Sequence, residues 1–165
     1  MGTRIIILFL FVSLLALAVA DPLPRGSLSE TEVLEQSRIY VAQHQYVSAL
    51  KVLNSGLGYH PESEAILAEF QKDAELYIVH EISSGYRKIS KNVHDVWAYI
   101  QISNAFMMAG QSTKALEVLT EGVSANPRSS VLWHAIGKLE KKSGRPKEAD
   151  SAFQEAARLQ TRLFN

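Results

Sequence analysis

The sequence predicts an all-α protein, a solenoid of antiparallel helix pairs preceded by a signal peptide. Tyr99 and Trp133 stand about 34 residues apart, and Gly110 and Gly144 keep the same spacing, a period typical of stacked helical repeats. An apolar run near the start of the chain, residues 5–20, precedes these repeats. The same step joins further pairs of similar residues: Ile102 with Ile136, Ala115 with Ala149, Leu119 with Phe153, and Gly122 with Ala156.

Residues 1–20 predict a cleaved secretory signal peptide. Arg4 gives a short positive start, residues 5–20 are all apolar or small, and Ala18-Val19-Ala20 has the small-x-small pattern of a cleavage site. Sixteen residues span about 24 Å as a helix, whereas a transmembrane helix needs about 20 residues for a core of roughly 30 Å. The alternative is that this run stays uncleaved as a membrane anchor.

The rest of the chain divides into a linker, residues 21–29, and a helical domain, residues 30–165. The linker is rich in proline, serine and glycine, which favour irregular backbone. Ser29 begins the first helix, because Glu32 three residues later completes a capping box. The domain is expected to hold four units, at about 30–61, 62–95, 96–129 and 130–163.

The first unit is a weaker copy of the unit that begins near residue 96, displaced by about 66 residues, or slightly less than two repeat steps. Tyr40 corresponds in this way to Phe106. Its first helix keeps helical spacing of apolar or small residues as far as His44. Its second helix is expected to end at residues 56–58, because glycines followed by Pro61 are stop signals.

The segment over residues 62–89 leaves two interpretations open. Apolar residues keep a helical period throughout, no proline interrupts them, and only Ser83-Ser84-Gly85 could break the helix. The segment is either a degenerate repeat with a short second helix or one long helix that bridges its neighbours. We favour the degenerate pair.

The last two units have the clearest helix signals. Asp95 is placed to cap a helix over residues 96–108, and Asn126-Pro127 ends the following one. Pro146 stands at the first position of the final helix, where its missing N–H costs nothing. The expected helices cover residues 96–108, 112–125, 130–143 and 147–163.

Charge is distributed unevenly along the chain. Residues 21–82 hold four basic and ten acidic residues, net −6; residues 83–127 hold four and three, net +1; residues 128–165 hold eight and four, net +4. One interpretation is a set of solvated helix faces. The other is head-to-tail electrostatics, between copies or with a charged partner.

No sequence motif points to catalysis, a cofactor or a metal. Cysteine is absent, which removes disulfides and thiolate ligands. The chain has no G-x-S-x-G, no H-E-x-x-H and no phosphate-binding glycine loop, and its five histidines show no i, i+4 pairs. We expect a protein that is not an enzyme and binds no cofactor.

These features resemble the tetratricopeptide repeat, whose pattern is W-x2-L-G-x2-Y, then A-x3-F and a late proline, over about 34 residues. The last unit matches at Trp133, Ile136, Gly137, Gly144, Ala149, Phe153 and Ala156. It departs at Glu140, where the tyrosine would stand. The unit before it matches at Tyr99, Ile102, Phe106, Gly110, Ala115, Leu119, Gly122 and Pro127, with Ser103 at the glycine position. The resemblance implies a superhelix with a concave groove lined by the first helix of each unit.

The resemblance also implies the residues that would bind a partner in that groove. They are Trp97, Ile100, Asn104, Met107, His134, Lys138 and Lys141, with Met108 and Val131 beside them. Some family members clamp a carboxylate with lysine and asparagine at such positions, but Ile100 replaces the lysine here, so no clamp is expected. We hypothesise that the partner places apolar residues over Trp97 and Met107 and an acidic residue near the two lysines. The alternative for Met107 and Met108 is that one of them packs in the core.

The C-terminal end is a candidate for self-association or docking. Leu159, Leu163 and Phe164 are still apolar, and no capping helix follows. The alternative is that Leu163 and Phe164 fold back on Trp133.

The resulting expectation is a non-catalytic secreted or lumenal scaffold or adaptor, located in the secretory pathway: secreted, in the ER lumen or in the periplasm. Its partner would be a protein, presented as a peptide or helix, and not a nucleic acid. One alternative is a membrane-tethered adaptor, with the membrane involved only through an uncleaved N-terminal segment. Another is an accessory subunit of a secretory-pathway enzyme.

Overall fold

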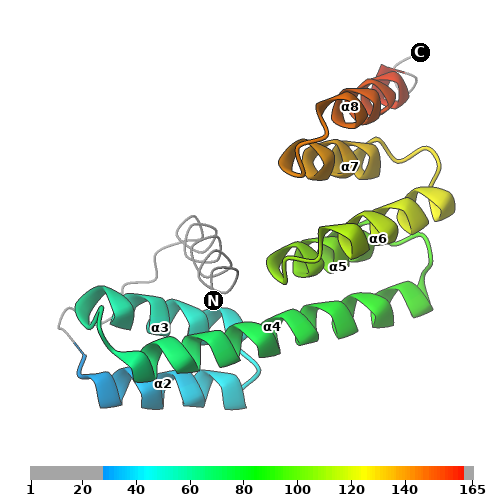
Figure 1. The fold of residues 1–165 in the computed structure, drawn as a ribbon. Helices are drawn as coiled ribbons and strands as arrows, with labels where there is room; N and C mark the ends of the chain where they lie inside the picture. The colour runs from blue at the N-terminus through cyan, green and yellow to red at the C-terminus, as the bar shows by residue number, and fades with distance from the viewer. Residues whose placement is uncertain (1–27, 162–165) are drawn as a thin grey trace. The chain divides into compact units, whose positions relative to one another are not determined.

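The computed structural model describes residues 28–161, in which every regular element is an α-helix (Figure 1). Contacts divide the chain into two compact units, unit 1 (residues 1–79) and unit 2 (residues 80–165). The predicted signal peptide, residues 1–20, and most of the linker lie outside the described residues. The helices are α2 (Glu30–Ala42), α3 (Tyr46–Tyr59), α4 (Glu64–Lys91), α5 (Val96–Met108), α6 (Ser112–Ala125), α7 (Ser130–Lys142) and α8 (Pro146–Thr161).

Three pairs of consecutive helices pack against each other, as the repeat pattern predicts. These are α2 with α3 in unit 1, and α5 with α6 and α7 with α8 in unit 2. The first helices of the three pairs begin at positions 30, 96 and 130, and the second helices at positions 46, 112 and 146. Both sequence spacings, the single step and the slightly shortened double step, are therefore confirmed as spacings between helices.

The preference for a degenerate helix pair over residues 62–89 is wrong. One helix, α4, runs unbroken for 28 residues through Ser83-Ser84-Gly85. Gly85 does not end the helix because it serves packing instead: a Cβ there would collide with Ile102 of α5. The close approach within unit 2 offsets the cost of a helical glycine, about 1 kcal/mol relative to alanine.

Two helix ends in unit 1 also differ from expectation. The helix α3 continues past residues 56–58 to Tyr59, because Gly56 is a packing residue whose added Cβ would lie 2.5 Å from Val33 of α2. The helix α2 ends at Ala42, and His44 lies in the turn with φ 58°. Gly110 and Gly144 hold the same turn position in unit 2, with φ 73° and 76°.

Small residues allow the two helices of a pair to approach closely. In the last pair, a Cβ added to Gly137 of α7 would lie 2.5 Å from the ring of Phe153 on α8. The corresponding positions of the earlier pairs hold buried serine on the first helix and buried leucine on the second. The predicted alternation of small and large residues is thus present in the packing, and these serine–leucine positions are Ser37 with Leu53, and Ser103 with Leu119.

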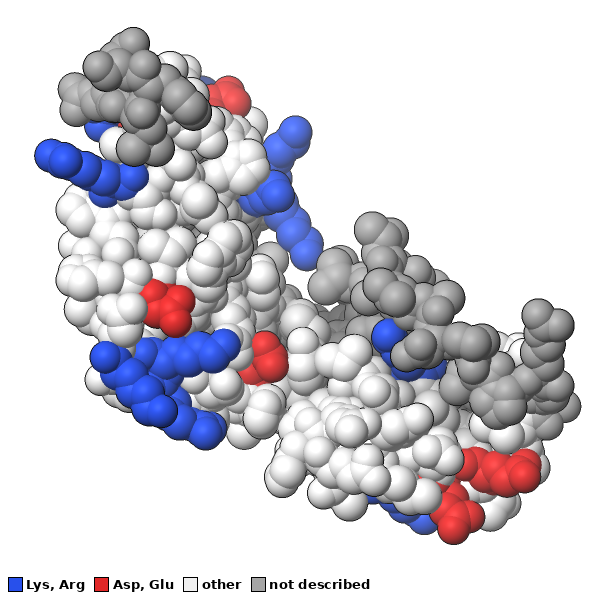
Figure 2. Space-filling model, turned by 180° about the vertical axis from the view of Figure 1, so that it is seen from behind, with Lys and Arg blue, Asp and Glu red and all other residues white. Residues whose placement is uncertain are grey.

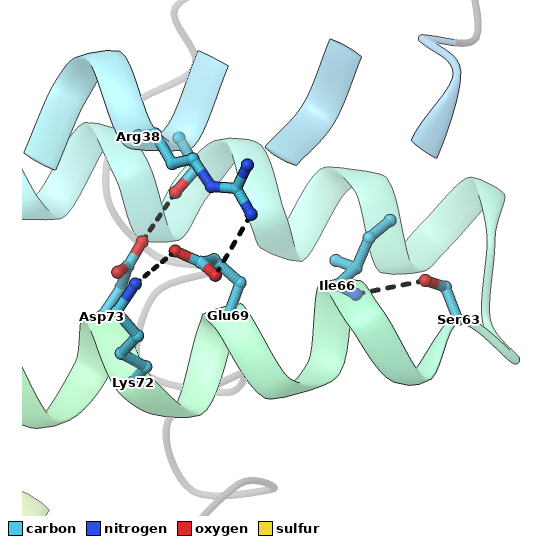
Figure 3. Close-up of polar contacts among 7 residues, drawn as sticks. Arg38, Ser63, Ile66, Glu69, Lys72 and Asp73 are labelled. Carbon is cyan, nitrogen blue, oxygen red and sulfur yellow. Dashed lines mark hydrogen bonds and ion pairs between the residues drawn. The ribbon is translucent and has the colours of Figure 1, made fainter. Parts of the chain in front are cut away.

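A buried carboxyl group lies between α2 and α4 in unit 1 (Figure 3). Asp73 is fully buried, and the Ser37 hydroxyl donates to its Oδ2 at 2.6 Å. Its Oδ1 has no hydrogen-bond partner among the described residues. Burial raises the pKa of Asp73, and the bond from Ser37 opposes that rise only partly. The helical period of apolar residues did not predict that Asp73 is buried. Asp73 occupies a position in the apolar stripe of α4, but an aspartate does not count as apolar in such a pattern.

An ion-pair network borders this buried group at the surface. Glu69 accepts from Lys72 Nζ at 2.8 Å and lies 3.8 Å from the Arg38 guanidinium (Figure 3). The two basic side chains are mostly exposed, so the pairs are worth little individually, about 0–1 kcal/mol. They nevertheless connect α2 to α4 beside Asp73.

The outer surface of α8 is polar in the described residues. Ala149, Ala152, Ala156 and Leu159 are buried, while Glu148, Asp150, Gln154 and Arg158 are exposed. A polar outer face is what a terminal repeat requires. Leu163 and Phe164 lie outside the described residues. Self-association through this end stays a prediction, and a monomeric mass by light scattering at tens of micromolar would contradict it.

Candidate protein-binding face

The residues predicted to bind a partner divide between α5 and α7, both in unit 2. On α5, successive spacings of three, four and three place Trp97, Ile100, Asn104 and Met107 along one side of the helix. Trp97 is 69% exposed, the largest exposed fraction among the exposed large apolar side chains of the described residues. The other side of α5 is buried and includes Ala98, Tyr99, Ile102 and Ala105.

Two of the α5 residues contribute to the core as well as to this side. Ile100 and Met107 are half-buried and pack against the core cluster of unit 2. The proposed alternative, that a methionine packs in the core, therefore applies in part to Met107. Asn104 is exposed. Trp97 and Asn104 are the α5 residues most available to a partner.

On α7, a similar spacing places His134, Lys138 and Lys141 on an exposed side. Leu132 and Leu139 are buried on the opposite side. The His134 ring lies 5.3 Å from the Phe153 ring of α8, centroid to centroid. Neither lysine forms an ion pair with an acidic group among residues 28–161. The two ammonium groups therefore remain available for an acidic partner.

The fold brings the two sets together. The helices α5 and α7 contact each other directly and run in the same direction, because α6 returns antiparallel between them (Figure 1). One repeat step relates Trp97 to Val131 near the helix starts, and Met107 to Lys141 near the helix ends. We call this surface the α5/α7 face: Trp97, Ile100, Asn104, Met107, Val131, His134, Lys138 and Lys141.

The flank of α5 away from α7 is already occupied within unit 2. The Gln101 amide donates to the Glu81 carbonyl at 3.1 Å and accepts from Lys88 Nζ at 2.7 Å. Both partners lie on the part of α4 that belongs to unit 2. These bonds hold α5 against α4 within unit 2.

Sequence reasoning missed one apolar residue and one ion pair. Val93, in the turn before α5, is 49% exposed, and a turn position gives no periodic signal. Glu140 stands at the repeat's tyrosine position and is buried, paired with the Arg145 guanidinium at the turn to α8. A basic residue five positions after an unexpected acid was the available signal. The departure from the repeat pattern is thus compensated locally.

Basic side chains gather in groups on the face seen in Figure 2. Along the chain, exposed basic residues are concentrated at the end of α4, with Arg87, Lys88 and Lys91, and at the end of α7, with Lys141 and Lys142. The described part of unit 2, residues 80–161, holds eleven basic and eight acidic residues, net +3. Between residues 28 and 161 no group of three or more histidine, aspartate or glutamate side chains is arranged to hold a metal. That range also contains no helix that is both long enough and apolar enough to cross a membrane.

No protein-family model matches the sequence, and no curated protein matches it. The fold is similar to a solved MamA structure, with a TM-score of 0.47 and 18% identity over 80% of this chain and 78% of that one. It is also similar to MamA, residue 41 to the end, from Desulfovibrio magneticus RS-1, with a TM-score of 0.46 and 14% identity over 81% and 76%. For TTC0263, a thermophilic TPR protein of Thermus thermophilus, the TM-score is 0.47 with 18% identity over 81% and 75%. These are likenesses of fold alone.

The resemblance to the tetratricopeptide repeat is carried by this chain's own residues and packing. Three consecutive helix pairs are present, and the last two follow each other at one repeat step. The small residue of one helix meets the large residue of the other at Gly137 and Phe153. The chain thus resembles the tetratricopeptide repeat both in its sequence pattern and in its helix pairs.

Proposed function

We propose that this protein is a non-catalytic, secreted or lumenal interaction module, a scaffold or adaptor that binds a protein partner on the α5/α7 face. The observation that carries the proposal is Trp97, 69% exposed at the start of α5. Tryptophan is among the residues most enriched in binding hot spots. An exposed tryptophan leaves a large apolar surface in water that a partner could bury. Exposed Lys138 and Lys141 on the same face supply charge.

The partner is a peptide or a helix with apolar and acidic residues. Ile100 and Met107 are half-buried on the same side of α5 as Trp97. They therefore offer a partner a flat apolar surface, whereas Trp97 is mostly exposed. Methionine adapts its shape to irregular partners. Lys138 and Lys141 favour an acidic residue by charge complementarity, which steers association and fixes register.

Location in the secretory pathway is supported by the apolar run over residues 5–20 and the Ala18-Val19-Ala20 motif. N-terminal sequencing of the protein from its native host tests it. A chain that begins at Asp21 supports a cleaved signal peptide. A chain that keeps residues 1–20 and sediments with membranes supports the tethered adaptor instead.

Capture of partners from the native secretory fraction tests the binding face. The full chain would be compared with Trp97→Ala and with Lys138→Glu/Lys141→Glu, all of which change exposed side chains. Matched controls are Tyr59→Ala, which removes an aromatic residue 61% exposed in unit 1, and Lys147→Glu, which reverses an exposed charge on α8. Loss of the same partner with both face variants and retention with both controls is expected.

Retention of every partner by the face variants would move the binding surface elsewhere and contradict the proposal. The composition of the captured complex separates the two remaining roles. A single enzyme in one-to-one stoichiometry, with activity that depends on this protein, supports an accessory subunit. Several partners that exclude each other support an adaptor.

A further inference from the structure

We infer that this protein forms an antiparallel homodimer in which a stripe on α4 pairs with the same stripe of a second copy. The α4 stripe consists of Leu76, Val79, Ser83 and Tyr86, at alternating steps of three and four residues. That alternation is the spacing of a coiled-coil seam. None of the four residues belongs to the α5/α7 face, so the inference is independent of the proposed function.

The α4 stripe has no partner helix within its own repeat, because the second repeat lacks its internal turn. The helix α4 begins 34 residues after α2, which is one repeat step (Figure 1). In the other three repeats, the turn after the first helix holds a residue with positive φ: His44, Gly110 or Gly144. Ile78 stands 34 residues after His44 and 32 before Gly110, and a β-branched residue rarely adopts that conformation. The helix therefore continues, and its two halves cannot pack on each other.

The α4 stripe is exposed at positions that the helix pairs bury. Leu76, Val79 and Tyr86 are 40%, 62% and 45% exposed, and Ser83 is exposed as well. The second helices of the three pairs bury apolar residues at two of these positions. They are Ala49, Ala115 and Ala149 at the position of Ser83, and Val52, Val118 and Ala152 at that of Tyr86. A helix laid along the stripe would restore this burial.

The stripe lies on the side of α4 opposite to its packed residues in each unit. In unit 1, Val79 stands nine residues, or about two and a half turns, after the fully buried Phe70. In unit 2, Ser83 stands two residues, or about 200°, from Gly85, where an added Cβ would collide with Ile102 of α5. A second helix can therefore lie along the stripe without displacing the packing of either unit.

Charge favours a second copy of this chain as the occupant and sets its direction. Residues 64–79 hold four acidic residues and one basic residue, net −3, whereas residues 80–91 hold one acidic and three basic residues, net +2. The sign of the first part stays negative if the buried Asp73 is left out. Antiparallel pairing lays the acidic part of each copy along the basic part of the other. Parallel pairing would oppose like charges, which is unfavourable.

The alignment follows from the positions of the apolar residues. A two-fold axis at residue 81 sets Leu76 at the level of Tyr86 of the second copy, and Val79 at the level of Ser83. All three exposed apolar side chains of the stripe are then covered, and each pairing occurs twice. The same axis brings Glu75 to the level of Arg87 of the second copy. The seam from residue 76 to residue 86 is about 15 Å long.

Sedimentation equilibrium of the protein as isolated from its host tests the inference. Wild type is expected to pass from monomer to dimer between about 10 µM and 1 mM, because the seam is short. Leu76→Gln/Val79→Gln should weaken dimerisation at least about tenfold, since both apolar side chains are buried in each copy. The matched control is Ile39→Gln/Val47→Gln, which removes two apolar residues of unit 1 that are 45% and 39% exposed. It should leave the dissociation constant unchanged.

Charge reversal tests the antiparallel direction. Glu75→Lys or Arg87→Glu alone should weaken the dimer about two- to fivefold at low salt. The two substitutions together restore opposite charges across the seam and should recover the association of wild type. In a parallel pair each of these residues stands level with its own counterpart, so neither single reversal would weaken association.

Spin labels measure the direction independently, because the chain has no cysteine of its own. Gln71→Cys and Lys91→Cys each place a label at an exposed position ten residues from residue 81, one on either side. In either labelled homodimer the two labels should stand about 30 Å apart along the axes, at about 1.5 Å per residue. A parallel pair would bring them to roughly the separation of neighbouring helices, about 8–10 Å.

Three results would overturn the inference. The first is a monomer at every concentration up to about 1 mM. The second is a dimer whose dissociation constant is unchanged in Leu76→Gln/Val79→Gln, because such a dimer would use another surface, such as the C-terminal end. The third is a short distance in both labelled homodimers, which would show that the two copies of α4 run parallel.

Discussion

His44 occupies a backbone conformation that the later repeats give to glycine. It is the only non-glycine residue with positive φ among residues 28–161. Left-handed backbone costs an L-residue about 1–2 kcal/mol, although histidine is found there more often than most residues. Its Nδ1 lies 3.1 Å from the Tyr46 hydroxyl, a local bond that offsets part of this cost.

The equivalent turn of the last repeat, at Gly144, provides a test of backbone strain without steric interference. A Cβ at Gly144 would meet no atom within 4 Å, so Gly144→Ala should lower the free energy of unfolding by about 1–2 kcal/mol through the positive φ alone. His44→Ala keeps a Cβ already present and should change stability by less than about 0.5 kcal/mol beyond the lost bond to Tyr46. Urea unfolding measures both. Equal losses in the two variants would contradict this account.

Asp73 gives a pH dependence whose sign is fixed by its burial. Its pKa is raised in the folded protein, so the native state holds the proton to a higher pH than the unfolded chain does. Stability from this group is complete below the unfolded value, about 3.9, and is lost as pH rises through the folded value. Asp73→Asn should therefore gain stability relative to wild type across that window, by at most about 1.4 kcal/mol per pH unit.

Chemical denaturation from pH 3 to pH 7 measures this difference. Asp73→Asn retains an amide oxygen that can accept from the Ser37 hydroxyl. A matched control is the same substitution on the exposed surface of α8, Asp150→Asn. A stability difference that stays constant or shrinks with rising pH would show that Asp73 titrates normally.

At the scale of helices, the sequence predicted the pairs well and the middle helix poorly. Capping by Ser29 and Asp95 is present as expected, because side-chain caps are local chemistry that a sequence displays directly. The continuity of α4 was missed, because whether Gly85 ends a helix or admits Ile102 depends on a neighbour that no local pattern reveals. The positions of the binding residues follow from the repeat, but their exposure does not, as Met107 shows.

Hydrogen exchange tests whether α4 is continuous. In a single helix, every backbone amide of residues 84–88 donates to the carbonyl four residues earlier. These amides should therefore be protected from exchange like those of residues 68–72. A turn at Ser83-Ser84-Gly85 would leave several of these amides exchanging at nearly the free rate. Ser84→Pro should cost about 3 kcal/mol or more in a continuous helix. Only a small loss would be expected if a turn were there.

The contact between Gly137 and Phe153 predicts a coupled pair of substitutions. Gly137→Ser should destabilise α7 against α8 by about 1–3 kcal/mol through overpacking. Adding Phe153→Leu should recover part of this loss, because serine opposite leucine is the combination at Ser103 and Leu119. Thermal unfolding of the single and double variants gives the coupling energy.

Gly58 is the control for this pair. A Cβ there would meet nothing within 4 Å, and Gly58 is the second-last residue of α3. Gly58→Ala should therefore stabilise the protein, by up to about 1 kcal/mol, through helix propensity. If Gly137→Ser also stabilised the protein, propensity rather than packing would dominate at that position.

At the scale of the whole molecule, stability is expected to be local to each unit. Repeat proteins derive stability from each repeat and its nearest neighbours rather than from one shared core. Leu53 in unit 1 and Leu132 in unit 2 are both fully buried. Substitution of either by alanine should cost about 2–5 kcal/mol.

The prediction concerns which helices lose stability when each leucine is replaced. Leu53→Ala should raise amide exchange mainly in α2 and α3, and Leu132→Ala mainly in α5 to α8, whose residues share the core cluster of unit 2. Exchange measured residue by residue under native conditions distinguishes this from a uniform effect. A uniform rise in both variants would mean that residues 28–161 open as one cooperative block.

The pairing of a small residue on one helix with a large residue on the next also limits how such a chain can be rearranged by duplication. Gly137 suits Phe153, while the serines at the same position accompany leucines. A recombination event that joins the first helix of one repeat to the second helix of another would place serine opposite phenylalanine or leave a void behind leucine. Exchanges whose crossover falls between complete helix pairs keep each matched combination intact, so a complete helix pair is the smallest segment that such an exchange can move without a packing mismatch.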